Sequence, residues 1–345
     1  MRLPFVSTMT ALLIGIAAIA LLSAITGPAS VSLLSLVENA FSHFSISDSS
    51  LNSAAITNSL EWIVFLELRF PRVVFALCIG CILAQSGATM QGLFRNPLAD
   101  PGIIGVSSGA ALGAIAAIVL LPAEWKVWSV PLMAFVSGLA TTLFVYTLAH
   151  NARGTSVLIL LLAGVAISAF SGAAIGLMSY FADDANLREL SVWQMGTLAN
   201  ASAQHLLPIT IFTLGLAYAF QRNAASLNAL LLGEPEARHL GIDVEKLKRH
   251  SMLLVALGVG VCVSYSGIIG FIGLVVPHLV RMLAGPDHRF LLPLSALMGG
   301  LLLLISDLIA RILISPAELP IGLITALMGA PFFVALLIQE RKRVS

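Results

Sequence analysis

Charged residues are scarce in this chain of 345 residues. Asp, Glu, Lys and Arg together make up 10% of it, whereas a soluble domain carries about 25%. The hydrophobic fraction is 58% and the mean hydropathy is +0.98. No basic tract points to nucleic acid. This composition excludes an ordinary soluble enzyme and indicates a protein embedded in lipid, where long apolar runs form helices that satisfy their own backbone groups.

Cysteine is also scarce, and each of the three cysteines stands inside an apolar run. Cys78 and Cys81 form a C-x-x-C pair, and Cys262 lies in a later run. Small apolar surroundings favour packing over redox or metal chemistry. We therefore predict no catalytic residue, no metal site and no cofactor on this chain.

Two absences bear on the energy source. The sequence lacks G-x-x-x-x-G-K-[ST], the loop that holds nucleotide phosphates. If ATP drives the protein, a partner chain binds ATP and Mg. Only Asp307 lies well inside an apolar run, with Arg311 as its i,i+4 partner. Proton-coupled transporters depend on such groups, so a secondary exporter is the weaker alternative.

Hydropathy predicts an all-α membrane protein with about ten transmembrane helices in a single polytopic domain, residues 1–345. The first run also resembles a signal peptide, but no clear small-x-small cleavage site follows it, which favours retention. The predicted spans are Met9–Ile25, Val73–Phe94, Ile103–Leu121, Val127–Ala149, Val157–Phe181, His205–Phe220, Met252–Ser266, Ile268–Leu283, Phe290–Ile314 and Ile321–Ile338.

The distribution of Lys and Arg predicts the orientation. With ten spans and a cytoplasmic N-terminus, thirteen of the eighteen fall on the cytoplasmic side. Arg69, Arg72, Lys126, Arg188 and Arg311 remain outside, as does the long connection Thr26–Leu68. The positive-inside rule therefore places both termini in the cytoplasm.

A second long connection, residues 221–250, lies on the cytoplasmic side. Leu227, Leu230 and Leu231 recur at helical spacing, Gly233 ends the run, and Pro235 opens a further turn that stops at Gly241. Two short amphipathic helices are typical of a docking element, although a solvated loop is the simpler alternative.

A match to G-x-S-x-G runs from Gly105 through Ser107 to Gly109. In serine hydrolases this motif follows a strand and needs His and acid partners. Here it opens an apolar segment rich in Gly and Ala, so we interpret the small residues as helix-packing positions. An intramembrane hydrolase is therefore disfavoured.

Several motifs in order resemble one family, the FecCD-type permeases of type II ABC importers. They lie between about Leu68 and Leu337, and consist of Leu68-Arg-Phe-Pro-Arg72, Gly92-Leu-Phe-Arg-Asn-Pro-Leu-Ala-Asp-Pro-Gly102, Gly270-Phe-Ile-Gly-Leu-Val-Val-Pro-His-Leu-Val-Arg281 and Ala317-Glu-Leu-Pro-Ile-Gly322 with Gly329-Ala-Pro331. The resemblance implies the type II importer permease fold in a bacterial inner membrane. It also implies a homodimer of this chain, two ATPase subunits beneath it and a periplasmic substrate-binding protein above it.

The resemblance assigns roles residue by residue. Arg69, Arg72 and Arg311 match the outer arginines that receive acidic residues of the binding protein. A cytoplasmic gate matches Asn96 and Leu98 in one turn and Thr155 and Ser156 before another helix. The coupling segment that enters a cleft of the ATPase matches Leu227–Gly241, and its marker residues are Leu227, Leu230, Leu231, Gly233, Glu234 and Gly241.

The substrate is predicted less directly. Leu231-Leu-Gly-Glu-Pro-Glu-Ala-Arg-His-Leu-Gly241 and Leu190-Ser-Val-Trp-Gln-Met-Gly196 look most like the haem members of the family. We expect an iron chelate, with haem favoured, a ferric siderophore next and cobalamin as the alternative.

Overall fold

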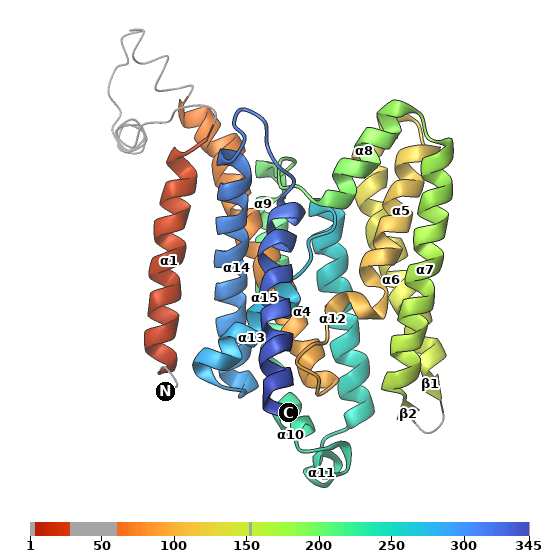
Figure 1. Cartoon of the computed structure of the whole chain (residues 1–345), viewed down its shortest axis with the longest axis vertical. Coiled ribbons are helices and arrows are strands. Elements are labelled where there is room, and N and C mark those ends of the chain that lie inside the picture. The colour runs from red at the N-terminus through yellow and green to blue at the C-terminus, as the bar shows by residue number, and fades with distance from the viewer. Residues whose placement is uncertain (1–3, 28–60, 152–153, 345) are drawn as a thin grey trace.

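The computed structural model describes residues 4–27, 61–151 and 154–344, and almost all of them are helical. Every apolar segment predicted from hydropathy forms a helix (Figure 1). These helices are α1 Phe5–Ile25, α4 Phe70–Leu93, α5 Val106–Leu120, α6 Lys126–Ala149, α7 Val157–Phe181, α9 Leu206–Arg222, α12 Val244–Ser266, α13 Ile272–Ala284, α14 His288–Ile312 and α15 Ile321–Val344.

Not all ten are long enough to cross a bilayer as single straight helices. Seven helices in the described residues have the length and apolar composition of a span, and the apolar stretches Val106–Leu120, Ile272–Ala284 and Ile321–Leu336 are shorter. The all-helical membrane fold is thus confirmed, while a count of ten crossings stays a prediction.

Short elements connect these helices. They are the π-helical turn η1 Phe65–Arg69, the 3-10 turns η2 Pro101–Ile104, η3 Ala123–Trp125 and η4 Ala203–His205, the helices α8 Asp184–Met195, α10 Ala224–Leu231 and α11 Glu234–His239, and the strands β1 His150–Asn151 and β2 Gly154–Thr155. The strands pair antiparallel, with His150 opposite Thr155. Hydropathy did not predict α8, which is amphipathic and short.

The predicted start of the second span is wrong. The helix that contains α4 begins at Glu61 and not near Val73, so Arg69 and Arg72 lie within it. Charged Glu61, Glu67 and Arg69 interrupt the apolar pattern and hid about the first three turns. The rest of the connection that starts at Thr26 is outside the described residues from residue 28 to residue 60.

The two ends of the bundle differ (Figure 1). α8 and the start of η1 lie at one end, which we call the α8 end. α10 and α11 lie at the other, the α11 end, together with the start of α1 and the end of α15. The two termini and the predicted coupling segment therefore share one side of the molecule.

Local chemistry fixes several helix starts. Asp183, Ser156, Asp243 and Asp287 each accept a hydrogen bond from a backbone N–H in the first turn of the helix that follows. Such caps satisfy N–H groups that have no partner inside the helix.

α4 is the central helix, and glycines let its neighbours touch its backbone. A Cβ on Gly80 would lie 2.2 Å from the carbonyl oxygen of Gly299 in α14, and one on Gly87 would lie 1.8 Å from that of Gly273 in α13. These contacts form a glycine seam, as small residues do in close membrane helix pairs.

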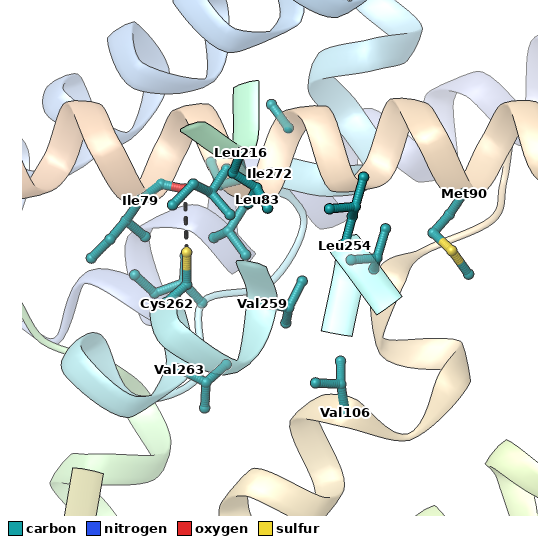
Figure 2. Close-up of a cluster of buried hydrophobic side chains, with 14 of the residues drawn as sticks. Ile79, Leu83, Met90, Val106, Leu216, Leu254, Val259, Cys262, Val263 and Ile272 are labelled. Carbon is teal, nitrogen blue, oxygen red and sulfur yellow. Dashed lines mark hydrogen bonds between the residues drawn. The ribbon is translucent and has the colours of Figure 1, made fainter. Parts of the chain in front are cut away.

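Apolar side chains from several helices complete the core around α4. Ile79 and Leu83 of α4 meet Leu216 of α9, Val259 of α12 and Ile272 of α13 (Figure 2). Cys262 belongs to the same cluster, with its Sγ 3.9 Å from the carbonyl oxygen of Ile79. The cysteines are free thiols, and no group of His, Cys, Asp or Glu in the described residues could hold a metal.

Candidate functional site

Arg72, Asp307, Arg311 and Glu318 form an ion cluster at the α8 end. Arg72 Nε donates to Asp307 Oδ1 at 2.7 Å, and its Nη1 donates to Glu318 Oε2 at 2.8 Å. Arg311 Nε lies 3.1 Å from Asp307 Oδ2, as the i,i+4 spacing predicted. Asp307 is fully buried, whereas the Glu318 side chain is 33% exposed. The carboxylate of Asp307 therefore holds two guanidinium groups together inside the protein.

The end of α1 supplies further partners. Arg69 Nη1 donates to the carbonyl oxygen of Ala24 at 2.5 Å, and Arg311 donates to the carbonyl oxygens of Ser23 and Thr26 and to the Ser23 hydroxyl. The last carbonyls of a helix lack partners within the helix and carry its negative dipole end. Two arginines thus cap the C-terminal end of α1.

The predicted docking arginines are consequently not exposed cations. Arg69 is 5% exposed, Arg72 9% and Arg311 4%. Tertiary partners on α1, α14 and the segment after α14 surround them. Their predicted role in docking remains a prediction.

At the α11 end, the first predicted gate pair shapes a turn after α4. Asn96 Oδ1 accepts from the Leu98 backbone N–H at 2.9 Å, and the Asn96 carbonyl accepts from the N–H of Ala99 at 3.1 Å. Leu98 borders a small apolar pocket with residues of α13 and α15 that include Val275 and Phe332. The turn therefore abuts two helices that are distant in sequence.

The second predicted gate pair joins the β1–β2 hairpin to α7. Ser156 caps α7, and its backbone N–H donates to the carbonyl oxygen of Ala149 at 2.9 Å. Thr155 donates from both its N–H, at 2.9 Å, and its hydroxyl, at 2.8 Å, to Glu245 Oε2 at the start of α12. The two predicted gate segments thus lie at one end of the molecule.

The predicted pair of coupling helices is present as α10 and α11. Gly233, with φ of 132°, separates them, and Gly241, with φ of 81°, follows α11. Both glycines adopt backbone angles that other residues rarely take. The prediction of two short helices in this segment is confirmed, and the solvated-loop alternative is wrong.

The faces of α10 differ from the expectation. Leu227 is 0% exposed and Leu230 1%, because α10 packs on α4, α9 and α14. The chain itself therefore covers the face that Leu227 and Leu230 share. The exposed apolar side chains of the segment are instead Leu231, Leu232 and Leu240.

A polar clamp also fixes α10 to the start of α14. Asn228 Nδ2 donates to Asp287 Oδ1 at 2.6 Å, and Asn228 Oδ1 accepts from the backbone N–H of His288 at 2.8 Å. Burial raises the pKa of Asp287, but its hydrogen bonds from Arg289 N–H and Asn228 outweigh this and lower the pKa overall. The sequence offered no signal for this clamp, since the residues are 59 and 60 positions apart.

Lys248 is a buried cation that the sequence did not reveal. It is one of the thirteen Lys and Arg residues predicted on the cytoplasmic side, yet its side chain is only 4% exposed. Its Nζ lies 2.7 Å from Glu234 Oε1 in α11 and 3.2 Å from Glu245 Oε1, and donates to the carbonyl oxygen of Thr155 at 3.3 Å. Only its i,i+3 spacing from Glu245 could have been read from the sequence.

The G-x-S-x-G match has the predicted packing role. A 3-10 turn precedes it, not a strand, and Ser107 lies in the first turn of α5. A Cβ on Gly109 would lie 2.2 Å from Thr141 Oγ1, and one on Gly113 would lie 1.9 Å from Ser137 Oγ. These glycines bring α5 against α6.

Comparison with known proteins gives a consistent result. The model of the FecCD transport family matches residues 12–339. The hemin transport system permease protein HmuU of Yersinia pestis is 47% identical over 292 residues, covering 84% of this chain and 87% of that protein. The vitamin B12 import system permease protein BtuC of Vibrio vulnificus is 42% identical over 283 residues, covering 82% of this chain and 85% of that protein.

A solved structure agrees with these relatives. It is described as an inward-facing conformation of a metal-chelate type ABC transporter, with a TM-score of 0.82 and 32% sequence identity, covering 96% of this chain and 98% of that chain. On the family match, the relatives and this fold together, the chain belongs to the FecCD transport family of ABC importer permeases.

Proposed function

We propose that this chain is the membrane-spanning subunit of an importer that carries haem from the periplasm to the cytoplasm. The supporting observation is the 47% identity with a hemin permease over most of both chains, against 42% for a vitamin B12 permease. A ferric siderophore is the next candidate within the iron chelates. Cobalamin is the second candidate class, because several relatives carry that name.

The test compares cargoes in one assembly. The chain, its ATPase and its binding protein are reconstituted in lipid vesicles and supplied with haemin, a ferric hydroxamate or cyanocobalamin. We expect ATP-dependent uptake of haemin, with at most weak uptake of the other two. ATP-dependent uptake of cyanocobalamin without haemin uptake would assign the chain to the second class.

The proposal includes a homodimer in the bacterial inner membrane, with both termini cytoplasmic and the α11 end facing the ATPase subunits. The missing phosphate loop supports a separate ATPase, which would bind ATP and Mg. Leu231, Leu232 and Leu240 are 41%, 68% and 63% exposed at this end, and they are the side chains that a partner would cover.

Two variants test this contact. Leu231→Asp combined with Leu232→Asp should reduce co-purification of the ATPase, because charged side chains would then enter an apolar interface. Leu313→Asp is the matched control, since Leu313 is 63% exposed and directly follows α14, whose C-terminal end lies at the α8 end. Unchanged ATPase recovery with the double variant would show that the contact lies elsewhere. Leu230→Asp is unsuitable because Leu230 is buried.

The binding protein would dock at the α8 end through Arg69, Arg72 and Arg311. Glu318 is the one partly exposed acid paired with Arg72, so a carboxylate of the binding protein could take its place. Glu318→Gln should then strengthen binding-protein affinity, while rising salt should weaken it. An affinity that responds to neither would argue against charge pairing at Arg72. The binding-protein titration with Arg188→Gln, at an exposed arginine of the same end, provides the control.

A further inference from the structure

Lys248 lies between α11, the helix proposed to contact the ATPase, and Thr155, a residue of a predicted gate pair. On one side is Glu234, the first residue of α11, in the segment proposed to contact the ATPase. On the other is Thr155, which precedes the Ser156 cap of α7. Nζ of Lys248 contacts both, at 2.7 Å and 3.3 Å.

The ammonium group of Lys248 has its full set of partners there. An ammonium carries three N–H donors and no acceptor. Its three contacts are Glu234 Oε1, Glu245 Oε1 and the carbonyl oxygen of Thr155. Because the side chain is 4% exposed, removal of one partner would leave a buried charge poorly compensated, which is costly. The three elements are therefore held in one relative position.

Glu245 makes the second half of this connection. Its Oε2 accepts both hydrogen bonds from Thr155, while its Oε1 faces Lys248. His150, opposite Thr155 in the hairpin, places Nδ1 3.0 Å from the Thr155 hydroxyl and 3.9 Å from Glu245 Oε2. A Cβ on Gly154 would lie 2.8 Å from Glu245 Oε1. The carboxylate is thus enclosed by the hairpin and by Lys248.

From this geometry we infer that Lys248, with Glu245, is the positioning residue that transmits displacement of α11 to the hairpin and the start of α7. The inference rests on the proposed function, in which α11 meets the ATPase, and on the predicted gate role of Thr155 and Ser156. α11 cannot move by itself without separating the partly exposed Glu234 carboxylate from the buried Lys248 ammonium group. Lys248 thereby couples ATP hydrolysis by the partner to the gate.

The test measures haemin transported per ATP hydrolysed by the reconstituted importer. Lys248→Met keeps an unbranched side chain, one atom shorter, and removes the three N–H donors of the ammonium group. We expect this ratio to fall by about 5-fold to 150-fold, the usual range for coupling between two sites, while Lys248→Arg retains part of it. Lys246→Met, at an exposed lysine on the same turn of α12, should keep the wild-type ratio.

The ratio separates coupling from folding. A purely structural defect removes assembled importer and lowers hydrolysis and transport together, so that the ratio stays constant. A wild-type ratio with Lys248→Met would overturn the inference. If Lys248→Met fails to assemble, the same ratio is measured for Glu245→Ala, because the Glu245 side chain is 29% exposed. A wild-type ratio for Glu245→Ala overturns the inference, and a reduced ratio supports it.

Failure of the proposed function has a different signature. If the wild-type assembly transports none of the three cargoes, or does not retain an ATPase, the proposed function itself is wrong. If the wild type couples hydrolysis to uptake and the variants couple equally well, only the role of Lys248 is wrong.

Discussion

Asp307→Asn provides the most direct test of how the α8 end is held together. Asp307 is fully buried and its carboxylate lies 2.7 Å from Arg72 Nε and 3.1 Å from Arg311 Nε. The substitution keeps the shape of the side chain but removes the negative charge between two guanidinium groups. Arg72 then keeps its contact with Glu318, whereas the other hydrogen bonds of Arg311 in the described residues go to neutral oxygen atoms of Ser23 and Thr26.

The expected loss of stability follows from the burial of Asp307. Two unit charges about 4 Å apart interact by about 4 kcal/mol at an effective dielectric constant of 20, and breaking a buried pair usually costs about 3–5 kcal/mol. We therefore expect Asp307→Asn to lower the free energy of unfolding by about 3–5 kcal/mol. Glu318→Gln removes a partner that is one-third exposed, and it should cost about 0–1 kcal/mol.

The assay is denaturant unfolding of the purified chain in detergent micelles, with the midpoint and the slope both fitted. Equal slopes and a much lower midpoint for Asp307→Asn than for Glu318→Gln are expected. A cost below about 1 kcal/mol for Asp307→Asn would refute the reasoning, because Arg72 and Arg311 would then be compensated without the carboxylate.

Three further predictions concern other parts of the molecule. Gly87→Ala should lower the free energy of unfolding by about 3 kcal/mol, because its Cβ would lie 1.8 Å from the Gly273 carbonyl oxygen. Gly172→Ala, inside α7 with nothing within 4 Å, should leave the free energy of unfolding unchanged or raise it by up to about 1 kcal/mol in the same assay. The hydrogen bonds that lower the pKa of Asp287 stabilise the fold at pH values above the unfolded-state pKa of about 3.9, and this stabilisation is lost as pH falls through the folded-state pKa. Asp287→Asn should therefore flatten the acid limb of a stability–pH profile, and an unchanged limb would contradict this. Ser107→Ala should leave haemin uptake unchanged, and a large loss would revive the hydrolase interpretation.

Much of the helical architecture could be predicted because it depends on local signals. Apolar runs identified the long helices, and Gly233, Pro235 and Gly241 marked α10 and α11 through backbone angles that the residues themselves impose. The amphipathic helix α8 escaped detection because hydropathy registers spans and not short surface helices. The early start at Glu61 escaped because charges interrupt the run.

The site could be predicted only in part, because partners far apart in the chain decide burial. Helical spacing showed that Leu227 and Leu230 share one face of a helix. It did not show that other helices of the permease cover this face. Composition likewise gave no sign that Lys248 is buried, since Thr155 lies 93 positions away. The contact between Asp307 and Arg311 was predictable because both residues share one helix.

The ion cluster at the α8 end also has a consequence for biogenesis. Arg72 leaves the ribosome 235 residues before Asp307, which at about 5–20 residues per second is an interval of about 10–50 s. During that time its eventual carboxylate partner does not yet exist, and the arginine must keep its charge near the membrane surface, as long cationic side chains do. Membrane insertion of α14 is therefore the step that pairs Arg72, and a nascent chain stalled before it would display an uncompensated cation to membrane quality control.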